Sequence, residues 1–257
     1  MISATNARPA KVIGEGSIRV IGLHGWMGDY RLFEPTFPYW DRQKFTVAFL
    51  DCRGYGTRFG ETGEYTVEEV AHDVRDLARS LGWSRYHVIG HSMTGMTAQR
   101  LTVDVPEEVQ SIILVAALPA SGAKITDERR QLLLDAVGDG QIRKKLIDVN
   151  TGHTRAPEWL GGLRDLSLAG TSPKALLAYM SSWTGTDFSR EVVGNKTPVL
   201  AVLGGKDPGT SVERTHETVG TWYGSVAVKV LVDAGHYPMY EVPEQFVEIV
   251  SEHLAKF

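Results

Sequence analysis

The chain has 257 residues, of which 42% are apolar and 23% charged, a composition typical of a globular protein rather than a disordered, collagen-like or coiled-coil chain. The 27 lysines and arginines against 31 aspartates and glutamates leave a formal charge of −4, so we expect no nucleic-acid partner. Cys52 is the single cysteine, which excludes an internal disulfide and a cysteine-rich zinc site and favours a reducing compartment.

No apolar run approaches the roughly 20 residues that a membrane-spanning helix needs. The first residues also lack the basic and then apolar pattern of a signal peptide. We therefore expect no membrane association and a cytoplasmic location. No internal repeat is visible, and the sequence leaves the oligomeric state open.

Six short apolar runs rich in β-branched residues predict buried strands. In chain order they cover residues 18–23, 45–50, 86–90, 111–116, 198–203 and 226–232. Most are predominantly apolar rather than alternating, as strands are when both faces of a parallel sheet are covered.

Helical patterns separate several of these runs. Residues 66–81 place their apolar side chains on one helical face, and Thr66 with Glu69 predicts a capping box at the start. Further helices are expected over residues 93–104 and 245–254. The alternation predicts an α/β fold with a mostly parallel, doubly wound sheet and helices on both faces.

The alternation stops between residues 119 and 196. This stretch has helical segments near 127–137 and 173–183 but no convincing strand, and glycines punctuate it. We expect a helical cap over the carboxyl edge of the sheet, where open α/β sheets bind ligands. The predicted division is a core of residues 1–118 and 197–257 with a cap insertion at 119–196.

The segment from Gly90 to Gly95, GHSMTG, directly follows a predicted strand and opens a helix. A serine on such a sharp turn projects its hydroxyl above the sheet edge, next to the free N–H groups of the helix N-terminus. Ser92 is therefore a candidate nucleophile, with an inert helix N-cap as the alternative. Gly90 supplies one small residue that the turn needs, but Thr94 stands where the usual pattern has a second glycine.

A serine hydroxyl needs a base, and the base needs a group that orients it. His236 follows the last predicted strand and Asp207 the one before it, so both are expected at the sheet edge that carries Ser92. The alternatives are a structural histidine, a turn-capping aspartate, and Asp233 as a rival acid that lies too close in sequence to the histidine. Five further histidines show no metal-ligand spacing, and we expect neither a metal nor a cofactor.

These three loops, together with LHGWMG at residues 23–28 and DCRGYG at 51–56, resemble the α/β-hydrolase fold family over nearly the whole chain. The resemblance implies that Ser92, His236 and Asp207 form a catalytic triad.

The same resemblance implies an oxyanion hole made by the backbone N–H groups of Trp26 and Met93. It also implies that the loop at residues 51–56 is structural, with Arg53 expected to pair with Asp51.

The type of residue at position 92 indicates which reactions of this family to expect. Epoxide hydrolases and haloalkane dehalogenases of this fold have aspartate at the elbow, so serine favours acyl transfer. We expect a hydrolase that cleaves a small or medium carboxylic ester or lactone through an acyl-enzyme on Ser92, with a small-molecule acyl substrate as its partner. The alternatives are a C–C bond hydrolase, a cofactor-free perhydrolase, or a ligand-sensing receptor on the same fold.

His24, His91, Trp159 and Trp183 are candidates for the substrate pocket. His24 is expected to set its loop rather than to take part in catalysis. His91 and the ring of Trp26 either line the pocket or pack in the core. Trp159 and Trp183 lie in the expected cap, where they either shape an apolar site or pack against the sheet.

Overall fold

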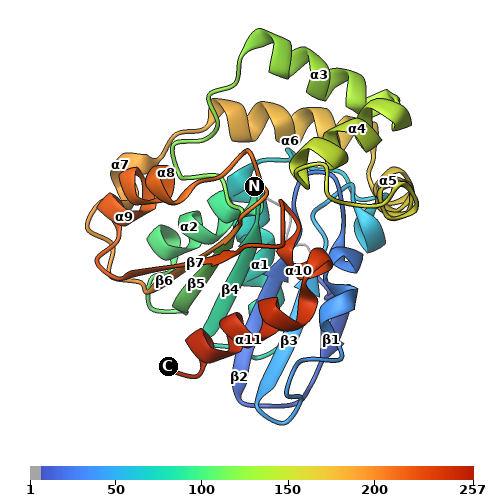
Figure 1. Ribbon diagram of the computed structural model, residues 1–257. Coiled ribbons are helices and arrows are strands. Elements are labelled where there is room, and N and C mark those ends of the chain that lie inside the picture. Colours follow the sequence, from blue (N-terminus) through green and yellow to red (C-terminus); the bar gives the residue numbers. More distant parts are fainter. Residues whose placement is uncertain (1–6) are drawn as a thin grey trace.

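The computed structural model describes residues 7–257, which form a seven-stranded sheet with helices on both sides (Figure 1). The spatial order is β1-β3-β2-β4-β5-β6-β7, and of these strands only β1 runs antiparallel to its neighbour. The predicted mostly parallel α/β class is confirmed. The strands are β1 (Lys11–Ile13), β2 (Ile18–Leu23), β3 (Phe45–Leu50), β4 (Tyr86–His91), β5 (Val109–Val115), β6 (Val199–Gly204) and β7 (Val226–Leu231).

All six predicted strands are present, with ends shifted by two residues at most. Strand β1 was not predicted. It has three residues, two of them exposed, and so it offers no continuous apolar run. It pairs with β3 at the edge of the sheet, where one exposed face is expected.

The helices on the two faces of the sheet begin close to their predicted positions. On one face α1 (Val67–Ser80) packs beside α2 (Thr94–Asp104), and Thr66 accepts a hydrogen bond from the Glu69 N–H as the capping box predicts. The other face carries the 3-10 helix η1 (Tyr30–Thr36), α10 (Pro238–Glu241) and α11 (Pro243–Leu254) (Figure 1). No helix within residues 7–257 is both long and apolar enough to cross a membrane.

Between β5 and β6 the described chain contains helices and no strand. They are α3 (Asp127–Gly138), α4 (Gly140–Asn150), α5 (Pro157–Gly170), α6 (Pro173–Gly185) and the short α7 (Ser189–Val192). Figure 1 shows α3 to α6 together at one end of the sheet. The sequence indicated α3 and α6 but not α4 and α5. In α5, Gly161 and Gly162 weaken the helical signal.

Buried Arg143 joins three helices of this insertion. It donates hydrogen bonds to the carbonyls of Ala136 and Val137 in α3, and to the hydroxyls of Ser167 and Thr171 at the end of α5. Every acceptor is neutral, and burial lowers the pKa of the guanidinium. The hydrogen bonds offset the cost of burying this charge.

The loop after β3 departs from its expected ion pairing. Arg53 pairs with Asp73 of α1 at 2.7 Å and with Glu69 at 3.0 Å, rather than with Asp51. Asp51 instead accepts hydrogen bonds from the backbone N–H groups of Tyr30 and Thr57. The prediction was wrong because the partner comes from a helix that only the fold brings close.

Three short helices complete the described elements. They are η2 (Gly56–Arg58), α8 (Val212–Glu217) and α9 (Val219–Trp222).

Candidate active site

Ser92 lies on a sharp turn between β4 and α2. Its φ angle is +54°, in the left-handed region that a serine rarely adopts. The turn is fixed from both sides. The Ser92 N–H donates to the Val115 carbonyl at 2.9 Å, and the Ser92 carbonyl accepts from Leu118 at 3.0 Å. The end of the neighbouring strand β5 thus holds the strained residue in place.

Gly90 allows β4 and α2 to approach each other. A Cβ atom there would lie 2.5 Å from the Thr94 carbonyl oxygen and 2.9 Å from the Cα of Gly95. Both contacts are with backbone, which cannot turn away as a side chain can. Glycine is therefore required at position 90.

Thr94 supplies contacts that a glycine would lack. Its hydroxyl accepts from the His91 N–H at 3.0 Å and lies 3.0 Å from the His24 carbonyl and 3.2 Å from that of Leu23. The departure from the usual pattern thus leaves the elbow tight and ties it to the loop after β2.

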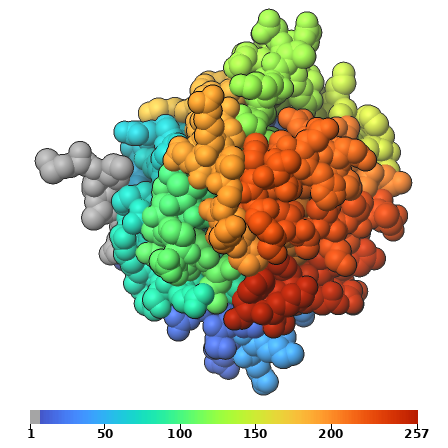
Figure 2. Space-filling view, turned by 90° about the vertical axis from the view of Figure 1, so that its left-hand side faces the viewer, coloured from blue at the N-terminus to red at the C-terminus, as the bar shows by residue number. Residues whose placement is uncertain are grey.

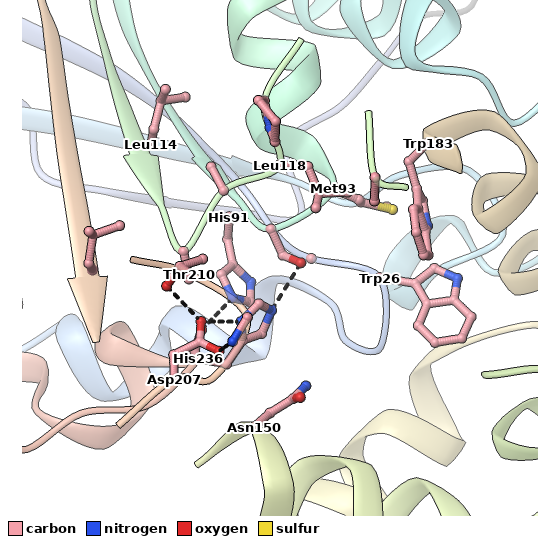
Figure 3. A pocket seen from close by; sticks show the side chains of 18 of the residues that line it. Trp26, His91, Met93, Leu114, Leu118, Asn150, Trp183, Asp207, Thr210 and His236 are labelled. Atoms are coloured by element: carbon pink, nitrogen blue, oxygen red, sulfur yellow. Dashed lines mark hydrogen bonds and ion pairs between the residues drawn. The ribbon is translucent and has the colours of Figure 1, made fainter. Parts of the chain in front are cut away.

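The three candidate catalytic residues come together above the carboxyl ends of β4, β6 and β7. The Ser92 Oγ lies 3.0 Å from His236 Nε2, and His236 Nδ1 lies 2.8 Å from Asp207 Oδ2 (Figure 3). An ionised carboxylate only accepts hydrogen bonds, so Nδ1 carries the proton and Nε2 is free to accept from the serine hydroxyl. The exposed rival Asp233 makes no hydrogen bond to His236 in the described chain.

Asp207 is held in its charged form. Burial of the side chain, which is 1% exposed, favours the neutral acid, but the charge and hydrogen bond of His236 outweigh it and lower the pKa of the carboxyl group. The Gly209 N–H and the Thr210 hydroxyl add hydrogen bonds of 2.8 and 3.1 Å. Asp207 is therefore ionised at neutral pH and can orient the imidazole.

His24 fixes the orientation of a nearby peptide group. Its Nε2 accepts from the Cys52 N–H at 3.0 Å, so Nδ1 carries the proton and donates to the Gly25 carbonyl at 2.8 Å. In a trans peptide the N–H of the next residue points the opposite way. The Trp26 N–H is thereby directed away from His24.

The N–H groups of Trp26 and Met93 make no hydrogen bond to another atom of the described chain. Met93 precedes the first turn of α2, where the helix dipole contributes partial positive charge. Two free donors of this kind can bind an oxygen atom that gains negative charge.

His91 is 1% exposed and makes a hydrogen bond to the backbone of the loop that carries His236. Its Nε2 donates to the His236 carbonyl at 2.8 Å, and its Nδ1 has no hydrogen-bond partner in the described chain. Burial, reinforced by the charge of His236, holds the pKa of His91 well below its usual range. His91 is therefore neutral; it binds the backbone carbonyl of His236, and the centroids of the two imidazole rings lie 5.1 Å apart.

A cavity of about 260 Å³ opens above these residues. Its apolar lining includes Leu114, Leu118, Leu133, Leu146, Leu203 and Val219. Two of the candidate pocket residues, His91 and Trp183, line this cavity, and so does Trp26. The indole N–H of Trp26 donates to the Leu176 carbonyl of α6, and its ring meets Trp183 edge-on at 6.1 Å.

Two pocket predictions differ from the structure. Trp159 does not line the cavity but packs edge-on against Tyr240 at 5.4 Å, with Arg155 over its ring. His24 is fully buried beneath the loop and also lies outside the lining.

Across residues 7–257 no cluster of three or more potential metal ligands occurs.

Asn150 also lies at the site, although no sequence pattern predicts a role for it there. It ends α4, and its side chain lines the cavity (Figure 3). Its carbonyl accepts from the His236 N–H at 2.9 Å. Gly235 permits this approach, since a Cβ there would lie 2.5 Å from the Asn150 oxygen. A single asparagine at a helix end carries no sequence motif, so only the packing of the insertion reveals it.

The chain belongs to the alpha/beta hydrolase family, whose model matches residues 20–249. It is 28% identical to an uncharacterized protein of Mycobacterium tuberculosis over 82% of this chain and 68% of that protein. It is also 28% identical to the pimeloyl-acyl-carrier-protein methyl ester esterase of Aeromonas hydrophila, over 93% and 95% of the two chains. The enol-lactonase of Burkholderia xenovorans shares the fold, with a TM-score of 0.82, 22% identity and 95% coverage of each chain.

Proposed function

We propose that the protein is a serine hydrolase that cleaves a small or medium carboxylic ester or lactone through an acyl-enzyme on Ser92. The observation that carries the proposal is the hydrogen-bonded row from Ser92 through His236 to buried Asp207, at the floor of a cavity. Nucleophilic acyl transfer needs a serine that is accessible to substrate, a base in the correct tautomer and a buried acid that orients the base.

In the proposed reaction His236 takes the proton of Ser92 while the serine oxygen attacks the substrate carbonyl. Asp207 stabilises the imidazolium that forms. The N–H groups of Trp26 and Met93 bind the developing oxyanion, and donors of this kind typically contribute about 3–4 kcal/mol each. His236 then gives its proton to the leaving alcohol, and a water molecule activated by the same base hydrolyses the acyl-enzyme.

The comparisons support a hydrolase of this kind. The similar proteins include an ester-cleaving enzyme and a lactonase by name. A fluoroacetate dehalogenase from Burkholderia is 30% identical over 42% of the chain. Dehalogenases of this fold use an aspartate at the elbow, so a serine at position 92 favours acyl transfer over dehalogenation.

We further propose that residues 119–196 serve as the cap of the site. Leu133 in α3, Leu146 in α4 and Trp183 in α6 line the cavity from this segment. Substrate specificity would then reside largely in these helices, because the core supplies the reacting groups.

The experiment is hydrolysis of p-nitrophenyl acetate and butyrate by wild type and Ser92→Ala. We expect the substitution to lower kcat/KM on the order of 10³-fold or more, leaving only the residual effect of binding and the oxyanion donors. Ser121→Ala, a serine outside the hydrogen-bonded row, is the matched control and keeps full activity. Equal rates for wild type and Ser92→Ala would refute the mechanism.

Product analysis separates the alternatives that share the same residues. Wild type is incubated with an ester, with a 1,3-diketone, and with hydrogen peroxide plus a carboxylate. The proposal expects the ester to be the best substrate. Faster cleavage of the diketone or formation of peracid would assign a different bond to the same site.

A further inference from the structure

The cavity is lined by basic residues as well as apolar ones. Lys124 lies before α3, Arg129 is in the first turn of α3, and Arg214 is in α8. Asp207 is the one carboxylate that lines the cavity within the described residues, and His236 already engages it. The cavity therefore carries an excess of positive charge, although the whole chain has a formal charge of −4.

None of these three cations forms an ion pair in the part of the chain that the structure describes. Arg129 is half-buried. Among the other half-buried arginines, Arg31, Arg100 and Arg155 each bind a carboxylate at 2.6–2.8 Å. Arg19 and Arg75, like Arg129, form no ion pair in the described chain, but neither of them lines the cavity. A half-buried guanidinium without a counter-charge bears a desolvation cost that an anionic ligand would offset.

Arg129 lines the same cavity as Ser92 and His236. Burial is the main cause that raises the pKa of the Tyr237 hydroxyl; the hydrogen bond with Asn150 lowers it, and the positive charge of Arg129 lowers it to a smaller extent. Tyr237 adjoins His236 in the chain, lines the same cavity and packs edge-on against the imidazole at 5.3 Å. An anion held by Arg129 would thus lie within the cavity that contains Ser92 rather than on a remote surface.

The basic residues come from two segments that are distant in the chain but line one cavity. Figure 2 shows the green segment around α3 at the top of one face and orange segments below it. Both segments contribute to the cavity lining. Since the cations line a cavity with an otherwise largely apolar wall, the geometry fits a small anionic molecule better than an acidic macromolecule.

We propose that Arg129, assisted by Arg214 and Lys124, forms a subsite for a carboxylate of the substrate. The substrate is then an ester or lactone with an apolar body and a second, free carboxylate. The planar guanidinium of Arg129 matches a carboxylate in a two-pronged hydrogen bond. The identity of the cleaved bond rests on the proposed function, whereas the anion subsite does not.

A matched pair of esters tests the subsite. Monoethyl adipate and ethyl hexanoate have the same acyl length, and a carboxylate replaces the terminal methyl group in the first. We expect wild type to favour monoethyl adipate in kcat/KM. Arg129→Gln should lower that value about tenfold or more, mainly through KM, with ethyl hexanoate changed less than about twofold. Arg129→Lys should retain part of the preference, and added salt should reduce it.

Arg130→Gln is the control, because Arg130 neighbours Arg129 in α3 but is exposed and lies outside the cavity lining. It should leave both esters unaffected. Equal kcat/KM values for the two esters in wild type, or an equal loss for both in Arg129→Gln, would overturn the subsite.

Binding to the Ser92→Ala protein separates this inference from the proposed function. Trp26 and Trp183 line the cavity, so their fluorescence reports the binding of either ester without turnover. The subsite is supported if Ser92→Ala binds monoethyl adipate more tightly than ethyl hexanoate and if the Ser92→Ala, Arg129→Gln double variant loses this binding. This holds even if wild type hydrolyses neither ester. If both esters are hydrolysed but bind equally well, the proposed function is supported and the subsite is contradicted. If monoethyl adipate does not bind at all, the subsite is likewise contradicted.

Discussion

Thr94 illustrates how one side chain couples two parts of the site. Its hydroxyl connects the elbow that carries Ser92 with the backbone of His24, next to the loop that presents the Trp26 N–H. A hydroxyl can donate only one proton, so the contacts with the carbonyls of His24, Leu23 and His91 share it. The distance between the nucleophile and the proposed oxyanion donor therefore depends on this residue.

Replacement of Thr94 by valine tests this coupling, because valine keeps the shape and removes the hydroxyl. We expect the free energy of unfolding to fall by about 1–2 kcal/mol, since buried carbonyl and N–H groups lose their partner. Ester hydrolysis should lose about tenfold or more in kcat with little change in KM, because the reacting groups are displaced. Denaturant unfolding and steady-state kinetics measure the two effects.

Thr97→Val is the matched control, since Thr97 is equally buried in α2 and makes no hydrogen bond to the β2 loop in the described chain. It should leave kcat near the wild-type value. An unchanged kcat in Thr94→Val would show that the hydroxyl does not position the site.

At the scale of secondary structure, the site depends on how closely β4 and α2 approach. The side chains of an ordinary strand and helix would hold the two backbones apart. Gly90 removes this barrier on the strand. Gly95 allows the helix to approach the loop after β5, where a Cβ would lie 2.3 Å from that of Ala117. The elbow is therefore a property of two elements and not of Ser92 alone.

Gly90→Ala should disrupt this packing. The added methyl group meets the backbone of α2, and overpacking of this kind typically costs about 1–3 kcal/mol. We expect a lower unfolding free energy together with reduced ester hydrolysis. Gly161→Ala is the contrasting variant, because Gly161 lies inside α5 with nothing within 4 Å of its Cβ position. That change should stabilise the protein by up to about 1 kcal/mol. Equal stabilities of the two variants would contradict the close-approach argument.

At the scale of the whole molecule, buried histidines make stability depend on pH, and His87 and His253 contribute to this together with His91. Burial, aided by the charge of His253, lowers the pKa of His87 to about 4, and burial with the charge of Lys256 lowers that of His253 to about 4. The ordinary value is 6.5. Below that pH the unfolded chain takes up protons that the native chain does not, so the native state loses stability as the pH falls from 6.5 towards 4.

His253→Leu is expected to flatten this dependence. The Nε2 of His253 is buried without a hydrogen-bond partner in the described chain, so the apolar side chain has no polar contact to replace at this atom. Urea unfolding at several pH values between 7 and 4 measures the slope, which should be shallower than in wild type. His216→Leu, on the exposed side of α8, is the control and should keep the wild-type slope. Parallel slopes for His253→Leu and wild type would contradict the prediction.

The sequence predicted the strands well because most of them are buried on both faces. Residues 198–203 are apolar throughout, and residues 18–23 and 45–50 contain one polar residue each, so this pattern gives the strands before any contact is known. The elbow and the acid loop each follow a buried strand, and the base loop follows the more exposed edge strand β7. Parallel topology alone predicts that the side chains of the three loops share one edge. The boundary strand β1 and the helices α4 and α5 carry no comparable pattern.

The sequence by itself therefore determined the six longer strands, the order of their loops and the choice of Ser92, Asp207 and His236 as candidates, because buried strands and short loops are encoded by local residue pattern. Only the tertiary structure decided that Arg53 binds Asp73, that Trp159 turns away from the cavity, and that Arg129 and Asn150 enter it. These contacts join residues distant in the chain, and the packing of the helices from 119 to 196 sets them. Local pattern cannot specify the relative placement of helices, since several arrangements bury the same apolar faces equally well.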